Sequence, residues 1–179
     1  MKLPIIKTKR LVLKTLTDID AEALFEYRSK PEIYQHQIWK PKKLEEVKDF
    51  IKKYTQGFNI EGTWFQLGIY EKVSNALIGD FGLHFMEPGD SQVEIGITIA
   101  KEHQRKGYGQ EATKSVIGYL FKELNKHRII ASVEPRNIAS IALLESVGMR
   151  KEGYFKKSIF IDNKWEDDVV YAILEEEFK

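Results

Sequence analysis

The sequence contains no cysteine among its 179 residues. This absence excludes disulfides, thiolate zinc sites, thiol nucleophiles and CxxC redox chemistry at once. Proline is sparse too, with 5 residues beside 12 glycines, which excludes collagen-like and low-complexity classes. Because a chain without cysteine is compatible with a reducing compartment, we expect a cytoplasmic protein.

Long apolar runs are also missing. The longest are a few residues, whereas a membrane span needs about 20, and the basic start MKLPIIKTKR lacks the apolar run of a signal peptide. We therefore expect no membrane association. The histidines are few, far apart and not part of an HExxH motif, so no metal site is expected; they are His36, His84, His103 and His127.

Neither sign of charge predominates. Lys and Arg number 28 and Asp and Glu number 27, so the formal net charge is +1 and no global field favours nucleic acid. With 42% hydrophobic and 31% charged residues, the composition is that of a folded globular protein. The length predicts one domain over residues 1–179. The sequence leaves open whether the protein is a monomer or a homodimer.

Hydrophobic periodicity predicts alternating strands and helices. Strands are expected at residues 10–16, 63–71, 77–85, 92–100, 129–133, 151–161 and 165–174. Helices are expected at residues 18–28, 44–55, 112–125 and 137–148, with Pro31 ending the first. The last helix should bury Ile141, Ala142, Leu144 and Val147. One strand, helix and strand in sequence imply a right-handed parallel crossover, so the predicted class is α+β with a mixed sheet.

The strand at residues 92–100 has the clearest alternation. One face should carry Val93, Ile95, Ile97 and Ile99, and the other Glu94, Gly96, Thr98 and Ala100. After it comes the turn QRKGYGQEA at residues 104–112. Gly107 and Gly109 allow positive φ and close approach of a ligand, and the amides after them begin a helix. Such a turn binds phosphate; the simpler alternative is a glycine loop that caps a helix.

The same turn permits a second nucleotide-binding interpretation. Residues 107–112 satisfy the GxGxx[GA] dinucleotide fingerprint, with Glu134 as a ribose-binding acid. That motif requires its first glycine directly after the strand, whereas residues 100–106 intervene here and only one βαβ unit is found. A P-loop is excluded because GxxxxGK[ST] is absent.

Several further segments accompany this turn in a fixed order. KTKRLVL lies near the start, NIAS and ESVGM follow the crossover, and EG and DNKWEDDVVY lie in the closing hairpin. Together with VEIGITIA and Gln104-x-x-Gly107-x-Gly109 they resemble the GNAT superfamily of N-acetyltransferases, in its RimJ/RimL-like branch of ribosomal-protein N-terminal acetyltransferase-like proteins. The resemblance implies a GNAT-like acyl-CoA N-acyltransferase fold with a mostly antiparallel sheet and about four helices.

The resemblance also implies acetyl-CoA as co-substrate and a set of binding residues. The main chain of Ile97, Thr98 and Ile99 would pair with pantetheine where two parallel strands separate. Asn137 would hydrogen-bond the pantetheine arm, although the sequence alone also explains it as a helix cap with Ser140 at N3. The pyrophosphate would be held by amides from Arg105, Lys106, Gly107, Tyr108, Gly109 and Gln110.

The implied reaction is direct attack of a primary amine on the acetyl thioester in a ternary complex. An amine of pKa about 10.4 is protonated at neutral pH, and removing the proton requires about 3 pH units of help from a base. Glu94 is our candidate base; the alternative is a solvated strand glutamate. Leu144 replaces the tyrosine that many GNAT enzymes use beside the leaving thiolate, so by resemblance Ser140 would take that role.

The acceptor amine is left open by the sequence. By family analogy the first two helices, with Tyr34, His36 and Trp39 between them, would form one wall of its site. The C-terminal-hairpin glutamate of the RimL type falls near Ile159 here. Leu144 and Ile159 therefore motivate an alternative, a catalytically weak acyl-CoA-binding or regulatory module on the same fold.

Overall fold

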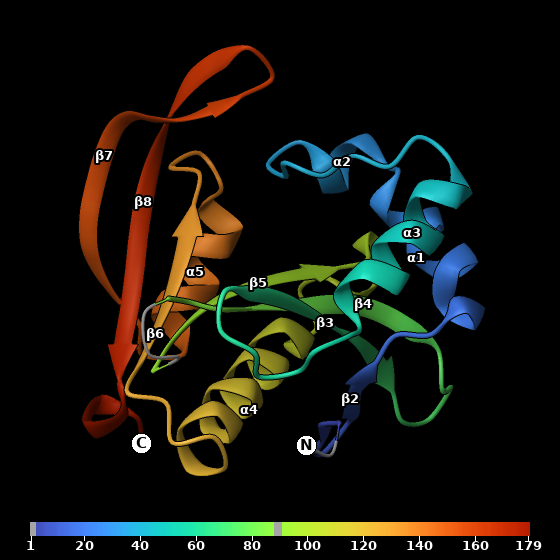
Figure 1. The fold of residues 1–179 in the computed structure, drawn as a ribbon, viewed down its shortest axis with the longest axis horizontal. Coiled ribbons are helices and arrows are strands. Elements are labelled where there is room, and N and C mark those ends of the chain that lie inside the picture. Colours follow the sequence, from blue (N-terminus) through green and yellow to red (C-terminus); the bar gives the residue numbers. More distant parts are fainter. Residues whose placement is uncertain (1–2, 88–90) are drawn as a thin grey trace.

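The computed structural model describes residues 3–87 and 91–179. In this part of the chain eight strands form one sheet in the order β1-β2-β3-β4-β5-β6-β8-β7 (Figure 1). Every neighbouring pair in that order is antiparallel except β5 and β6. The strands are β1 (Ile5–Lys7), β2 (Leu11–Thr15), β3 (Thr63–Glu71), β4 (Leu77–Phe85), β5 (Gln92–Ile99), β6 (Arg128–Val133), β7 (Arg150–Ile161) and β8 (Lys164–Leu174).

The four expected helices are present and a short fifth is added. They are α1 (Ala21–Arg28), α2 (Pro31–Tyr34), α3 (Leu44–Tyr54), α4 (Tyr108–Lys122) and α5 (Ile138–Ser146). Helix α4 begins at Tyr108, four residues before the predicted start, so the end of the predicted turn is helical. Pro31 begins α2 at its first position, where a missing N–H costs nothing and a fixed φ suits the helix. The expectation that Pro31 only ends α1 was therefore incomplete. Strand β1 was also missed, because three residues at a sheet edge are too few to show alternation.

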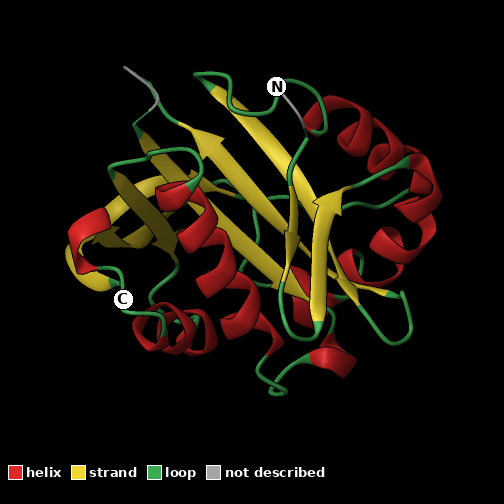
Figure 2. Cartoon of the chain, turned by 90° about the horizontal axis from the view of Figure 1, so that it is seen from below, coloured by secondary structure: helices red, strands yellow, loops and turns green. Residues whose placement is uncertain are grey.

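Helices cover both faces of the sheet (Figure 2). Strands β3 and β4 are buried along most of their length, as strands covered on both faces must be. One core cluster joins α4 to the sheet through residues such as Val116 and Phe81. A second cluster joins α1, α2 and α3 through residues such as Leu24 and Val47. No helix in residues 3–87 or 91–179 is both long and apolar enough to cross a membrane.

Strand β5 departs from the predicted alternation beyond Gly96. Thr98 and Ala100 are buried, whereas Ile97 and Ile99 are only partly buried. Ala100 packs in the cluster of α1 to α3, and Thr98 lies beside Asp80 of β4. The face expected to be polar is therefore covered by the N-terminal helices.

Helix α5 buries a narrower face than the sequence predicted. Leu144 and Val147 are buried and Ile141 is partly buried, but Ala142 is exposed. The physical reason is the helical period. At about 100° per residue Ala142 lies roughly 200° from Leu144, on the opposite side of the helix.

Candidate active site

A cavity of about 670 Å³ opens beside the place where β5 and β6 separate. Parallel pairing is limited to Gln92–Glu94 against Arg128–Ile130. Of the residues predicted from the sequence, the cavity lining includes Glu94, Ile97, Thr98, Asn137, Ser140, Leu144, His36 and Trp39. Ile99 and residues 105–110 lie outside that lining, as do Tyr34 and Ile159. The structure thus brings the two proposed catalytic residues into one space.

The main chain of β5 is divided between two neighbours. Ala100 N–H donates to Ile78 O at 2.9 Å and Met86 N–H to Gln92 O at 3.1 Å, and the register between these bonds does not shift. Even-numbered residues of β5, Thr98 among them, therefore bond to β4. The main-chain groups of Ile97 and Ile99 instead point to the side where β6 has diverged. Ile99 O accepts a hydrogen bond from Gln104 Nε2 at 2.9 Å.

The turn before α4 has an unusual backbone. Arg105 and Gly107 both have positive φ, 59° and 78°, and the helix begins at Tyr108. For arginine this conformation costs on the order of 1–3 kcal/mol, so surrounding contacts must hold it. The first amides of α4 have no partner within the helix itself. The turn therefore presents donors and a positive helix end together.

Glu94 reaches the cavity from β5 beside two ring side chains. Its carboxylate Oε2 lies 3.4 Å from His84 Nδ1 of β4. His84 stacks on Trp64 of β3, with ring centroids 4.8 Å apart. The Glu94 side chain is 25% exposed, so it is neither fully solvated nor sealed in the core. This is a position from which a carboxylate can meet a substrate in the cavity.

Asn137 and Ser140 lie at the start of α5. Asn137 Oδ1 accepts the Ser140 N–H at 3.1 Å, which confirms the predicted helix cap. Its side-chain NH₂ is a donor that this cap does not use. Leu144, one turn beyond Ser140, also lines the cavity and is buried. The α5 wall of the cavity therefore combines one amide, one hydroxyl and two apolar side chains, Leu143 and Leu144.

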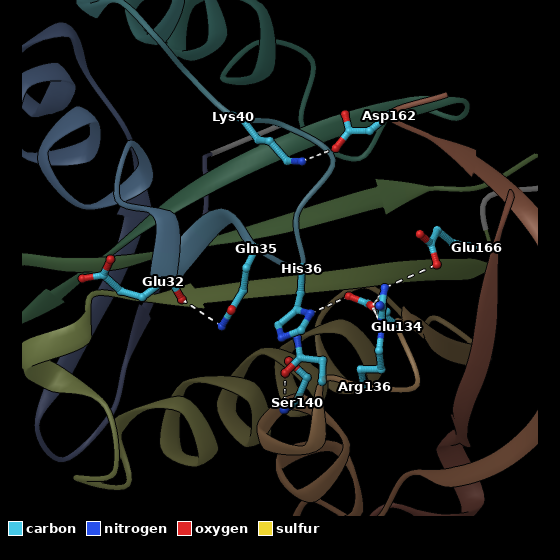
Figure 3. Close-up of polar contacts among 10 residues, drawn as sticks. Glu32, Gln35, His36, Lys40, Glu134, Arg136, Ser140, Asp162 and Glu166 are labelled. Carbon is cyan, nitrogen blue, oxygen red and sulfur yellow. Dashed lines mark hydrogen bonds and ion pairs between the residues drawn. The ribbon is translucent and has the colours of Figure 1, made fainter. Parts of the chain in front are cut away.

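A chain of charged side chains leads from the cavity lining to β8 (Figure 3). His36 Nδ1 contacts Glu134, whose other oxygen accepts from Arg136, and Arg136 reaches Glu166 of β8 at 3.3 Å. Burial raises the pKa of Glu134, but the hydrogen bonds from His36 and Arg136 outweigh it and lower that pKa below its ordinary value. Glu134 had been considered only as a ribose-binding acid. Its partner His36 is 98 residues away, so no local signal could have paired them.

A second polar network, under α1, was not foreseen either. Asp80 is fully buried on β4 and accepts from Tyr27 Oη at 2.6 Å and from Arg28 Nε at 2.9 Å. Gln66 Nε2 and Arg28 Nη2 donate to its other oxygen. Arg28 and Gln66 also line the cavity. Because Asp80 pairs with the Arg28 guanidinium, that cation contributes little net positive charge to the cavity.

Comparisons with known proteins now identify the family. Residues 10–150 match the acetyltransferase (GNAT) domain, so the chain belongs to this family. It is 36% identical over 173 residues to the uncharacterized N-acetyltransferase YnaD of Bacillus subtilis, covering 97% of this chain and 98% of that protein. It is 29% identical over 179 residues to the [ribosomal protein uS5]-alanine N-acetyltransferase of Escherichia coli, covering 94% and 89%. A crystal structure of a GNAT-family acetyltransferase from Bacillus anthracis superposes with a TM-score of 0.89 at 34% identity, covering 97% and 100%.

These findings confirm the predicted family, the mixed α+β GNAT fold and an N-acetyltransferase activity. The dinucleotide-binding interpretation of residues 107–112 is wrong. The glycine turn follows a short 3-10 helix, Lys101–His103, and not a strand, and among the described strands only β5 and β6 form a parallel pair.

Proposed function

We propose that this N-acetyltransferase transfers acetyl from acetyl-CoA to a cationic primary amine that carries an apolar or aromatic portion. The observation that carries the proposal is the cavity at the separation of β5 and β6. Its lining combines residues of β5 with aromatic rings and carboxylates. GNAT acetyltransferases use acetyl-CoA, and the residues of this chain fit that co-substrate.

The fit rests on polar groups for which the protein itself supplies few partners. Ile97 and Ile99 direct main-chain groups to the gap, so they would hold pantetheine, whereas Thr98 is engaged with β4. Asn137 would add a side-chain donor. Thr113 Oγ1, on α4, is buried in the cavity wall without a hydrogen-bond partner in the described chain. The pyrophosphate would lie against the amides of residues 105–110.

Bound acetyl-CoA supplies an activated acetyl group, and the side chains of this protein handle the protons. An ammonium of pKa about 10.4 must lose its proton before it can attack. Glu94 would take that proton, directly or through water. Ser140 would donate a hydroxyl hydrogen bond to the departing sulfur, since Leu144 offers none.

The acceptor class follows from the aromatic and charged residues of the cavity lining. Trp39 stacks on Phe50 with centroids 4.0 Å apart, and Tyr54 and Trp64 add further aromatic surface. The carboxylates in the lining are Glu46, Asp49, Glu94 and Glu134, against the cations Arg28 and Lys53. Arg28 is paired with Asp80, and Glu134 is paired with Arg136. The other three carboxylates face one lysine, so the net charge of the lining is negative. Such a wall attracts an ammonium and packs against apolar atoms.

The test is acetyl-CoA-dependent thiol release with a panel of acceptors. The panel contains peptides with free and blocked N-termini, polyamines, aromatic monoamines and their carboxylated analogues. Cationic amines with an apolar portion are expected to be turned over, and carboxylated analogues to be poor substrates. If acetyl-CoA stabilised the fold but none of the amines in the panel was acetylated, the enzyme proposal would be contradicted and an acyl-CoA-binding module supported.

Two glycines with similar positive φ supply the matched control. Gly107→Ala is expected to abolish stabilisation by acetyl-CoA, whereas Gly148→Ala is expected to retain it. Both have positive φ, 78° and 91°, so the conformational cost of an added Cβ is similar. Only Gly107 lies in the proposed pyrophosphate turn. Equal retention by the two variants would show that this turn is not the site.

A further inference from the structure

The segment KTKRL near the N-terminus contacts the turn before α4. Thr8 and Arg10 connect β1 to β2, and both reach Glu111 in the first turns of α4. Arg10 N–H donates to Glu111 Oε1 at 2.8 Å and Arg10 Nε to Oε2 at 2.6 Å, while Thr8 Oγ1 donates to Oε1 as well. One carboxylate thus receives three hydrogen bonds from a strand connection about 100 residues away in the sequence.

The same arginine also touches the turn itself. Arg10 Nη1 donates to Lys106 O at 2.8 Å, and the guanidinium lies 4.4 Å from the centroid of the Tyr108 ring. A Cβ placed on Gly107 would lie 3.3 Å from Arg10 Nη2. Arg10 therefore packs against the three residues at the start of α4, where φ of Gly107 is positive.

The bond to Lys106 O fixes the direction of an amide. A trans peptide is planar, so the carbonyl of residue 106 and the N–H of residue 107 point in opposite directions. By holding the carbonyl, Arg10 turns the Gly107 N–H away from itself. Lysine could not replace arginine here, because one ammonium cannot donate to both Glu111 and the Lys106 carbonyl and also stack on Tyr108.

The connection between β1 and β2 that carries Arg10 is in turn hydrogen-bonded to the rest of the sheet. Lys72 N–H donates to Arg10 O at 2.8 Å, and Lys72 Nζ donates to Thr8 O. Tyr108 Oη donates to Glu71 at the end of β3. The turn before α4 is consequently fastened to β1, β2 and β3 by side chains outside the cavity, none of which lines it.

From these contacts we infer that Arg10, fixed by Thr8 and Glu111, is a positioning residue that sets the conformation of the pyrophosphate-binding turn. The inference rests on the proposed use of acetyl-CoA. Without Arg10, residues 105–107 leave their strained conformation for much of the time. The apparent dissociation constant for CoA rises in proportion, because it equals the intrinsic constant divided by the fraction of molecules whose turn has the binding conformation.

The experiment compares titrations of CoA and of 3′-dephospho-CoA into wild type, Arg10→Ala, Glu111→Gln and the double variant. Both ligands contain the pyrophosphate. We expect Arg10→Ala to weaken both by the same factor, about tenfold or more, which is the effect of a loss near 1.4 kcal/mol. Glu111→Gln should weaken both similarly, and the double variant should add little, since the two residues act as one unit. Arg128→Ala, which removes an exposed ion pair with Glu152, is the control and should bind as wild type.

The other outcomes are distinguishable. A larger loss for CoA than for 3′-dephospho-CoA would show that Arg10 binds the 3′-phosphate directly, and would overturn the positioning role. If Arg10→Ala bound both ligands as wild type does but had a lower melting temperature, Arg10 would only stabilise the fold. That outcome would also overturn the positioning role. If wild type itself does not bind CoA, the proposed co-substrate fails, and the inference fails with it.

Discussion

At the scale of single residues, Glu94 and Ser140 reach one cavity from β5 and α5. The resemblance drawn from the sequence implies a tyrosine at position 144 or a glutamate near position 159 in other members, and this chain has leucine and isoleucine there. Leu144 is buried and apolar, so it can pack but cannot donate a proton. The proton chemistry of this chain therefore depends on groups other than a tyrosine at that position.

Glu94→Gln provides the first test at this scale. The variant keeps the shape of the side chain but cannot accept the ammonium proton, so kcat/KM at pH 7 should fall by about 10²-fold or more. The loss should diminish as pH rises toward the pKa of the amine, where the acceptor needs no base. The measurement is the pH profile of thiol release from pH 6 to 9.

Glu152→Gln is the control for that profile, because Glu152 pairs with Arg128 and Arg150 and does not line the cavity. If Glu94→Gln retained the rate of wild type over the whole range, Glu94 would not be the base. In that case the His36 and Glu134 pair in the cavity lining would be the next candidate to test.

At the scale of elements, α1 is attached to the sheet by the network around Asp80. Tyr27 and Arg28 come from α1, Gln66 from β3 and Asp80 from β4. The side chains of Arg28 and Asp80 are 9% and 0% exposed. A buried ion pair of this kind contributes little net stability, but loss of one partner leaves an uncompensated charge.

Asp80→Asn should accordingly lower the free energy of unfolding by about 3–5 kcal/mol. The partner guanidinium of Arg28 would remain buried without a counter-charge. Glu152→Gln, which removes the carboxylate from an exposed pair, should cost no more than about 1 kcal/mol. The measurement is urea unfolding of both variants. Equal losses of unfolding free energy would show that the buried network does not hold α1 on the sheet.

What could be predicted from the sequence depends on how far apart the interacting residues lie along the chain. Alternation and capping signals located β3, β4 and the cap at Asn137, because each depends on neighbours within a few residues. The reversal of burial at Thr98 depends instead on α1 lying over β4, which no local pattern encodes. Likewise, Glu134 with His36 and Arg10 with Glu111 were not predicted, since only the folded chain brings them together.

At the scale of the whole molecule, two ion pairs join the segment between α2 and α3 to the C-terminal part of the chain. Lys40 contacts Asp162 at the tip of the β7–β8 hairpin, and His36 contacts Glu134 after β6 (Figure 3). The segment 35–43 is thereby connected to elements more than 90 residues later. Because these pairs are ionic, we expect the stability of the folded protein to depend on the protonation of their members.

The sign of that dependence follows from Glu134. Its folded-state pKa is lowered, so its contribution to stability is complete above the unfolded pKa of about 4.3 and disappears as pH falls through the folded value. Glu134→Gln should therefore melt at a lower temperature than wild type at pH 7, and the difference should shrink below about pH 4. Thermal melts from pH 3 to 7 measure it. A difference independent of pH would contradict the ionic role of Glu134.

The short pairing of β5 with β6 has one further consequence. Beyond Glu94 and Ile130 the sheet contains an internal edge, with main-chain groups of Ile97 and Ile99 left without a neighbouring strand. Unpaired strand edges invite pairing with other chains and hence aggregation. Here the part of the edge at Ile97 lines a cavity walled by α5 and the N-terminal helices. An extended ligand can therefore enter and pair with it, while the sheet of another molecule is kept out.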